Sequence, residues 1–414
     1  MRQAHLVERQ TTSIFGYEVS KTCSICKMPA TRSGKAAAAG SSRSNEVVMG
    51  ESSSAGKGLF LGDWGSPDKI TLLADTYTVF SGLLQIDASR GNAGKRAAGG
   101  SRNSMPQIQA IRNYHRVSGL YRSSIMRYKE RLAAYSSPDF GEIQLASDLH
   151  ALMHLTEMLY LPADGTGAGV VGEEVLNWLN AYDVAPTTEE GQDIATAPIP
   201  YEHPRYWDYI LQCVLRGFNK SAASVLDSLS SHPSKVVARI AGKSIRLLQS
   251  FPRSTSYSHE AAFVQDRKGW QAQVRQLLQG LEREMDEMEE ELGHTDEVED
   301  QRIEYEAQYR CLLELMAGIR ERVFEACSDW REALGAWGLL VQPTMRRDDI
   351  PDVIAIILEK LPADSTLPLE RASIAFSKGE VFKGCTECRE IDPWLTAHVT
   401  NLLARAEVLQ DEDE

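Results

Sequence analysis

Two Cys-x-x-Cys pairs, Cys23/Cys26 and Cys385/Cys388, are the first residues whose spacing suggests chemistry. Paired thiolates serve in zinc sites and in redox-active dithiols. A zinc site with four cysteine ligands needs all four thiolates in one place, whereas these pairs lie about 360 residues apart. A thioredoxin-like motif would follow a strand, and none is predicted before either pair. The second pair falls on a predicted helix with Cys385 toward the core, so we expect no bound metal.

His150 and His154 are four residues apart, a spacing that places both imidazoles on one face of a helix. A metal site there would need a third ligand, and a metallohydrolase would also need a catalytic glutamate; the face offers neither. The pair flanks the apolar stripe that contains Leu149 and Leu152, which favours a packing role. An all-α enzyme that uses both histidines stays open as an alternative.

Two glycine–lysine segments resemble fragments of phosphate-binding loops, Gly56-Lys57-Gly58 and Gly94-Lys95-Arg96. Neither completes a GxxxxGK[ST] motif, and neither follows a predicted strand. The sequence also lacks a GxSxG elbow and a plausible Ser/His/Asp order. We therefore predict that the chain is not an enzyme and has no cofactor.

The charge is unevenly distributed over the 414 residues. Residues 1–137 hold 19 Lys and Arg against 9 Asp and Glu, a net +10, so the remainder carries −24 of a total of −14. An acidic body disfavours direct nucleic-acid binding, which requires phosphate neutralisation. The basic first third suits an acidic partner or a membrane surface, although a solvated flexible segment is the favoured interpretation.

The remaining bulk features indicate an intracellular globular protein. Seven scattered cysteines suggest reduced thiols in the cytosol or nucleus. The N-terminus lacks the apolar run of a signal peptide, and no window approaches the ~18 apolar residues of a transmembrane helix.

The segment Tyr201–Pro233 gives the clearest indication of the secondary structure of this chain. It predicts two short helices joined at Gly217, which can adopt the left-handed conformation that ends a helix. Pro204 suits the first turn, and Pro233 stops the second helix. Neither helix can bury its apolar stripe alone, so the hairpin must stack on neighbouring hairpins. We expect Tyr206 and Trp207 to hold it against the next one.

Helical periodicity dominates from Gln107 onward, and strand signals are almost absent after residue 105. We expect an all-α fold, an irregular solenoid of stacked helical hairpins with a short N-terminal β or disordered segment. Residues 1–58 are predicted to be mostly disordered. Residues 59–104 are predicted to contain candidate strands, a first helix over 70–86 and a flexible insertion, and residues 105–414 to form a helical solenoid.

In residues 282–300, 11 of 19 side chains are acidic. This run predicts a flexible loop at about 284–300, or an interaction tail for a basic partner.

Four segments together resemble one protein family, the eighty-five-kilodalton nucleoporins of the Y-shaped outer-ring complex of the nuclear pore. They are Asp63-Trp64-Gly65, Ser81–Asp87 followed by Arg112–Tyr114, Glu174–Leu179 followed by Tyr206–Gly217, and Lys383–Leu403. The likeness covers about residues 60–408 and depends on the order and spacing of these segments. Family members continue beyond the position of Glu414 with a helical tail, which indicates that this chain is a fragment or a truncated gene product.

The resemblance implies a structural scaffold at the nuclear envelope that supports pore assembly and the transport of mRNA and protein. Implied partners are a Seh-type WD-repeat β-propeller, completed by strands from Glu46–Ile70 of this chain, and other Y-complex scaffold nucleoporins. The candidate partner-binding residues are Val47, Val48, Leu59, Phe60, Leu61 and Trp64. A vesicle-coat or other adaptor α-solenoid is the alternative.

Overall fold

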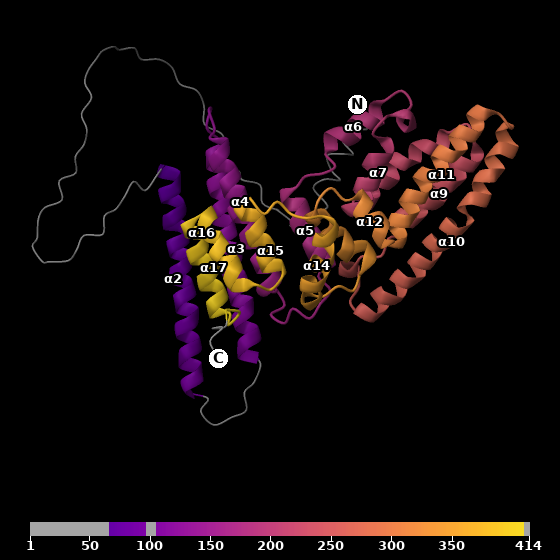
Figure 1. Ribbon diagram of the computed structural model, residues 1–414. Coiled ribbons are helices and arrows are strands. Elements are labelled where there is room, and N and C mark those ends of the chain that lie inside the picture. The colour runs from indigo at the N-terminus through magenta and orange to yellow at the C-terminus, as the bar shows by residue number, and fades with distance from the viewer. Residues whose placement is uncertain (1–65, 97–104, 410–414) are drawn as a thin grey trace, which may run out of the picture. The chain divides into compact units, whose positions relative to one another are not determined.

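The structure is a computed structural model that describes residues 66–96 and 105–409, with side chains over 66–86 and 107–409. All described residues belong to one compact unit. Every regular element in this part of the chain is a helix, which confirms the predicted all-α solenoid (Figure 1). The candidate β segment Glu46–Ile70 lies outside the described residues up to residue 65, and its last four residues, 67–70, begin the first described helix and are not a strand.

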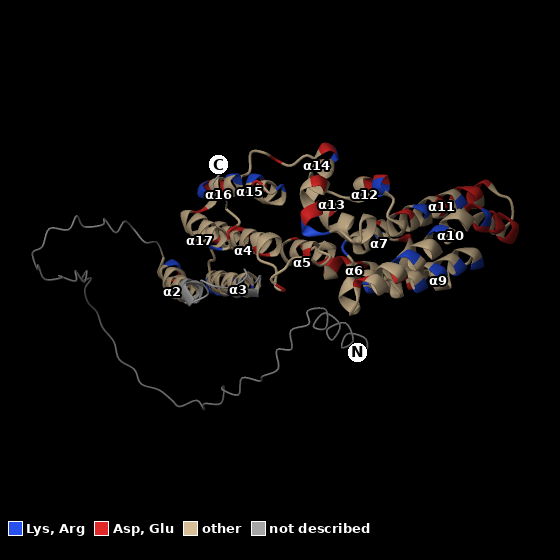
Figure 2. Cartoon of the chain, turned by 90° about the horizontal axis from the view of Figure 1, so that it is seen from below, with Lys and Arg blue, Asp and Glu red and all other residues tan. Residues whose placement is uncertain are grey.

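Helices α4 (Phe140–Tyr160) and α17 (Pro393–Arg405) lie between the pair α2 (Pro67–Arg96) and α3 (Met105–Ala133) and the pair α15 (Pro368–Ser377) and α16 (Val381–Ile391) (Figure 2). The first three described helices thus pack against the last three. Trp394 joins them, because its ring stands edge-on to Tyr121 at 6.1 Å and its Nε1 donates to Thr76 Oγ1 at 3.0 Å. The chain therefore closes on itself over more than 300 residues.

The middle of the unit depends on a close helix contact. It is formed by α5 (Gly172–Tyr182), α13 (Trp330–Ala336) and the π-helical turn η4 (Trp337–Val341). A Cβ atom on Gly172 would lie only 2.3 Å from the carbonyl oxygen of Gly338. Glycine is required at this contact because any side chain would separate the two backbones.

The remaining helices include the predicted hairpin, which stacks beyond this contact, and a helix that packs between α13 and α15. They are α6 (Thr188–Thr196), η1 (Pro200–Glu202), α7 (Tyr206–Leu215), α8 (Asn219–Leu226), η2 (Asp227–Ser231), α9 (Lys235–Gln249), η3 (Ser254–Ser256), α10 (Glu260–Leu292), α11 (Asp296–Ala317), α12 (Arg320–Ala326), η5 (Arg347–Asp349) and α14 (Ile350–Lys360).

The hairpin has the predicted turn and packing. Gly217 has φ +73° and separates α7 from α8, although α7 begins at Tyr206, two residues after Pro204. Trp207 contacts Tyr206 and Tyr309 edge-on at 5.2–5.4 Å, and so joins the hairpin to α11. Tyr309 in turn donates to the carbonyl of Val237 on α9 at 3.0 Å.

The acidic run is helical, which corrects the predicted flexible loop. It forms the end of α10 and the start of α11, joined only by residues 293–295. Met285 and Met288 are fully buried between the helices, and the acidic side chains occupy the other faces. Glu284 binds Lys243 at 2.6 Å, and Arg302 binds Glu289 at 2.5 Å. The two buried methionines supply the apolar stripe that the surrounding charge obscures in the sequence.

Three other helix boundaries follow from local features of the chain. The backbone of α2 continues to Arg96, beyond the first helix predicted over 70–86. Helix α6 begins with a capping box of Thr187 and Glu190. Gly318 adopts the left-handed conformation and ends α11, so α12 is a separate helix.

Removing the Trp207 side chain tests whether the hairpin contact is structural. Trp207 is only 9% exposed, so Trp207→Ala should lower the free energy of unfolding by about 3–5 kcal/mol, as large-to-small substitutions in a core do. Urea unfolding followed by far-UV circular dichroism measures this change. Tyr77→Ala is the control, because Tyr77 is 70% exposed and its loss should change stability by less than about 0.5 kcal/mol. Equal effects of the two substitutions would contradict a structural role for Trp207.

Candidate interaction surface

The predicted partner-binding residues Val47, Val48, Leu59, Phe60, Leu61 and Trp64 all lie outside the described residues. The nearest described part of the chain is the first turn of α2. There Asp68 accepts hydrogen bonds from Arg131 at 3.1 Å and from the Tyr135 hydroxyl at 2.6 Å, both near the end of α3. Lys69 binds Asp392, the residue that caps α17, at 3.4 Å. The segment that precedes α2 is thus joined to a firmly held helix.

His150 and His154 converge on one hydroxyl group. Nδ1 of His150 lies 2.7 Å from the Tyr182 oxygen, and Nδ1 of His154 lies 3.0 Å from it. Burial, with the nearby Arg122 charge, lowers the pKa of His150 to about 4 and that of His154 to about 3. Both imidazoles are therefore neutral near pH 7, and they join α4 to the end of α5. This geometry supports the packing role that the sequence favoured over catalysis.

The Cys385/Cys388 pair lies on the buried face of α16, as expected for Cys385. Burial raises the pKa of both thiols, that of Cys388 to about 12, so neither is a thiolate near neutral pH. Cys23 and Cys26 lie outside the described residues, as do Gly56–Gly58. In the part of the chain that the structure describes, no three His, Cys, Asp or Glu side chains converge as metal ligands, and Gly94–Arg96 form the last turn of α2.

A buried ion cluster that the sequence analysis did not identify joins the hairpin to the middle of the unit. Arg216, which follows α7, is 1% exposed. Its guanidinium donates to Glu332 on α13 and to Asp183 after α5, each at 2.6 Å. Its own carbonyl accepts from Asn180 at 3.0 Å. The only sequence signal was an arginine directly before the turn glycine, and its partners are 33 and 116 residues away.

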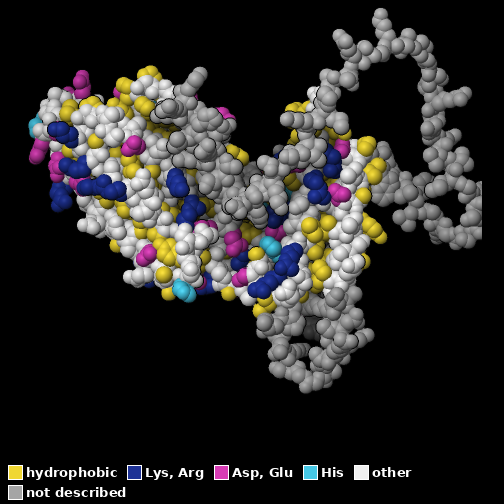
Figure 3. Space-filling model, turned by 180° about the vertical axis from the view of Figure 1, so that it is seen from behind, with side chains coloured by type: hydrophobic (Ala, Val, Ile, Leu, Met, Phe, Trp, Pro, Cys, Tyr) yellow, Lys and Arg dark blue, Asp and Glu magenta, His cyan; other side chains and the backbone are white. Residues whose placement is uncertain are grey.

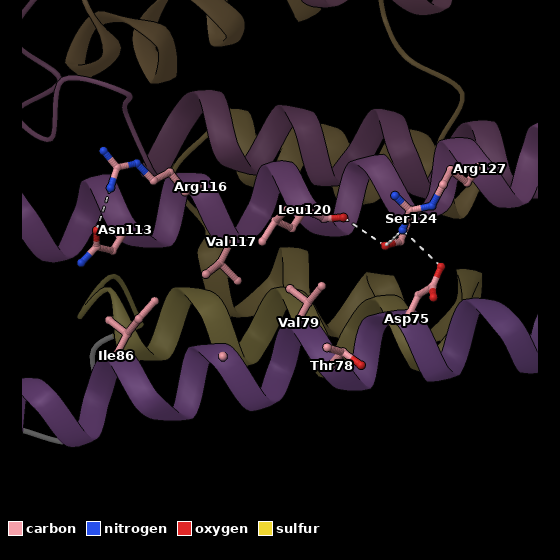
Figure 4. A pocket seen from close by; sticks show the side chains of 11 residues that line it. Asp75, Thr78, Val79, Ile86, Asn113, Arg116, Val117, Leu120, Ser124 and Arg127 are labelled. Carbon is pink, nitrogen blue, oxygen red and sulfur yellow. Dashed lines mark hydrogen bonds and ion pairs between the residues drawn. The ribbon is translucent and has the colours of Figure 1, made fainter. Parts of the chain in front are cut away.

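An open groove runs between α2 and α3 on the face that points away from α17 (Figure 4). The volume of this groove is about 590 Å³. Val79 and Ile86 of α2 and Val117 and Leu120 of α3 make its apolar surface, with Asp75, Thr78, Gly82, Asn113, Arg116, Ser124 and Arg127 completing the lining. Seen from behind, hydrophobic side chains gather along this pair of helices (Figure 3).

The apolar lining of the groove has no cover among the described residues. Leu120 is 54% exposed, and Val79 and Ile86 are only partly buried. Tyr77 and Leu84, which are 70% and 44% exposed, do not line the groove and lie on another side of α2. Single exposed apolar residues are ordinary on protein surfaces, but a contiguous set along a hollow marks an interaction site. The sequence analysis did not separate these residues from the core stripe of the same helix.

These features define a class of protein, an all-α scaffold built from stacked helices with an apolar groove on one face. Among the described residues, no helix combines the length and apolar character that crossing a bilayer requires. A family model for the Nup85 nucleoporins matches residues 63–414, and the chain belongs to this family.

Two curated relatives agree with this assignment. The nucleoporin nup85 of Schizosaccharomyces pombe is 22% identical over 312 residues, which cover 72% of this chain and 44% of the relative. The nuclear pore complex protein Nup85 of Danio rerio is 24% identical over 360 residues, which cover 83% of this chain and 50% of the relative. The chain thus spans about half the length of the curated relatives it matches.

The lowered pKa values of His150 and His154 predict that the free energy of unfolding depends on pH. Because both folded pKa values lie below the ordinary 6.5, the unfolded chain binds more protons between about pH 6.5 and 4. Stability should therefore fall as the pH falls through this window, by on the order of 1–2 kcal/mol per histidine at pH 5. Urea midpoints at pH 7 and pH 5 measure the effect.

A double variant isolates these two groups. His150→Gln with His154→Gln should flatten the loss of stability between pH 7 and pH 5. His294→Gln serves as the control, because the His294 side chain is 78% exposed in the short connection between α10 and α11. An unchanged pH slope in the double variant would show that other groups cause the loss.

Proposed function

We propose that this chain is a structural scaffold subunit of the nuclear pore complex outer ring, at the nuclear envelope. In this role it supports pore assembly and the nucleocytoplasmic transport of mRNA and protein, and it performs no catalysis. The observation that carries the proposal is the extent of the family match, which runs over residues 63–414 and so spans nearly all of the helical unit. Membership of a nucleoporin family also favours the pore over a vesicle coat.

The partners belong to the same proposal. We infer that residues 46–64, with Val47, Val48, Leu59, Phe60, Leu61 and Trp64, add strands to a Seh-type WD-repeat propeller. An exposed sheet edge binds such a segment through main-chain hydrogen bonds, with alternate side chains giving specificity. The firm hold on the first turn of α2 through Asp68 and Lys69 supports this proposal, because a propeller attached there would be fixed to the scaffold. Other scaffold nucleoporins of the ring would bind elsewhere on the chain.

The location is tested by tagging the chain at its own genomic locus and imaging living cells. A continuous nuclear rim that overlaps a pore marker is the expected result. Scattered cytoplasmic puncta without a rim would instead support a vesicle coat and overturn the proposal.

The propeller contact is tested by deleting residues 46–65, which leaves Asp68 and Lys69 in place. The deletion should reduce co-purification of the WD-repeat propeller at least about tenfold, because a strand-addition site would lose its main-chain hydrogen bonds. The far-UV circular dichroism of the helical unit should not change. Deletion of the equally long stretch 21–40 is the matched control and should leave binding intact. Undiminished propeller recovery after the first deletion would refute this mechanism.

A further inference from the structure

We propose that the groove between α2 and α3 binds a single amphipathic helix of a partner protein. This helix presents an apolar stripe to the groove and carries acidic residues on the flank that faces α3. The site is independent of residues 46–64, so it does not rest on the propeller contact.

The apolar stripe of α2 is wider than the part that described residues cover. Leu72 and Leu83 point inward and are at most 1% exposed. Val79 and Ile86 stand seven residues apart, two helical turns, and line the groove, where they are only partly buried. Leu120 of α3, on the other wall of the groove, is 54% exposed. The groove edge of the stripe therefore lacks a packing element among the described residues.

Gly82 supports a close approach by that element. It lies inside α2, where glycine costs about 0.5–1 kcal/mol of stability relative to alanine. A Cβ atom added there would meet nothing within 4 Å, so no described neighbour requires the glycine. It lines the groove beside Val79 and Ile86. Its missing side chain keeps the groove open for a bound backbone.

The shape of the groove favours a helix over a strand. Two neighbouring helices leave a straight furrow between their ridges, and a third helix fits such a furrow at a typical interaxial distance of about 8–10 Å. A helix satisfies its own backbone hydrogen bonds, whereas a strand laid on apolar side chains would leave a row of N–H and C=O groups unpaired. The groove thus suits helix-in-groove recognition, in which residues at i, i+3, i+4 and i+7 make the contacts.

The positive charges on α3 indicate that the facing flank of the bound helix carries acidic residues. Arg116 is exposed, and within the described residues its guanidinium donates to the Asn113 side chain at 3.3 Å but contacts no carboxylate. Arg127 is 55% exposed and has one such partner, Asp75 at 3.2 Å. The two arginines are 11 residues apart, about 16 Å along α3. A parallel or antiparallel partner helix would meet both with acidic residues about three turns apart.

The experiment measures binding of designed peptides to the full chain by fluorescence anisotropy. The probe is a capped peptide of about 18 residues in an Ala/Gln background, with Leu at helical spacing and two Glu about 11 residues apart. A second peptide replaces both Glu by Lys. The Glu peptide should bind with a Kd on the order of 100 µM or tighter, and the Lys peptide at least about threefold more weakly, as expected for exposed ion pairs.

Two of the three groove variants have matched controls outside the groove, and the third has a smaller substitution at the same position as its control. Leu120→Glu should weaken binding of the Glu peptide more than about tenfold, whereas Leu367→Glu, at a similarly exposed 50% site, should not. Arg116→Glu should weaken it about three- to tenfold, and Arg275→Glu on α10 should have no effect. Gly82→Leu should fill the groove and block binding, whereas Gly82→Ala should largely retain it. Circular dichroism verifies that each variant is folded.

Each outcome decides the proposal. Loss of binding in the three groove variants alone supports it. Equal binding of the two peptides, or equal loss in the control variants, overturns it. Absence of peptide binding together with self-association that Leu120→Glu abolishes, measured by sedimentation, would assign the groove to a second copy of this chain and also overturn it.

Discussion

The arrangement of this chain depends on compensating one buried charge. Arg216 has almost no exposure, and burying a guanidinium costs free energy unless protein groups replace its lost hydration. Glu332 and Asp183 supply such groups from α13 and from the end of α5, while Ser328 donates to the second oxygen of Glu332 at 2.8 Å. Three segments distant in sequence must therefore meet at one point. The Gly172–Gly338 contact, at the other end of α5, brings α5 close to the segment that follows α13.

A second buried arginine is compensated by different groups from those around Arg216. Arg267 on α10 is 3% exposed and, among the described residues, has no carboxylate within hydrogen-bonding distance. Its guanidinium lies 4.1 Å from the centre of the Phe251 ring and 4.7 Å from that of Trp270, and it donates to the carbonyl of Leu339 at 2.8 Å. Burial lowers its pKa to about 9. Aromatic rings thus hold Arg267 in place, whereas carboxylates determine which helices Arg216 brings together.

Local signals made much of the fold predictable. Ser234 and Asp392 cap the helices that follow them, and Gly217 and Gly379 adopt the positive φ expected after a helix. The acidic run was misinterpreted because its charge suggested a loop, whereas cross-helix ion pairs and two buried methionines hold it as a hairpin. One of these pairs uses Lys243 of α9, which a local sequence window does not include. The ion cluster at Arg216 was unpredictable for the same reason.

The groove was harder to predict than the helices because the period of α2 does not reveal which apolar face is inward. Residues 70–86 form one apolar stretch, and both Leu83 and Leu84 fit a helix stripe. Trp394 and His398, more than 300 residues later, contact Thr76 and Phe80 on one side of α2. Once α17 lies there, the opposite side of α2 is left open beside Leu120. The open face is thus a consequence of long-range closure, and any element that covers it must come from outside the described helices.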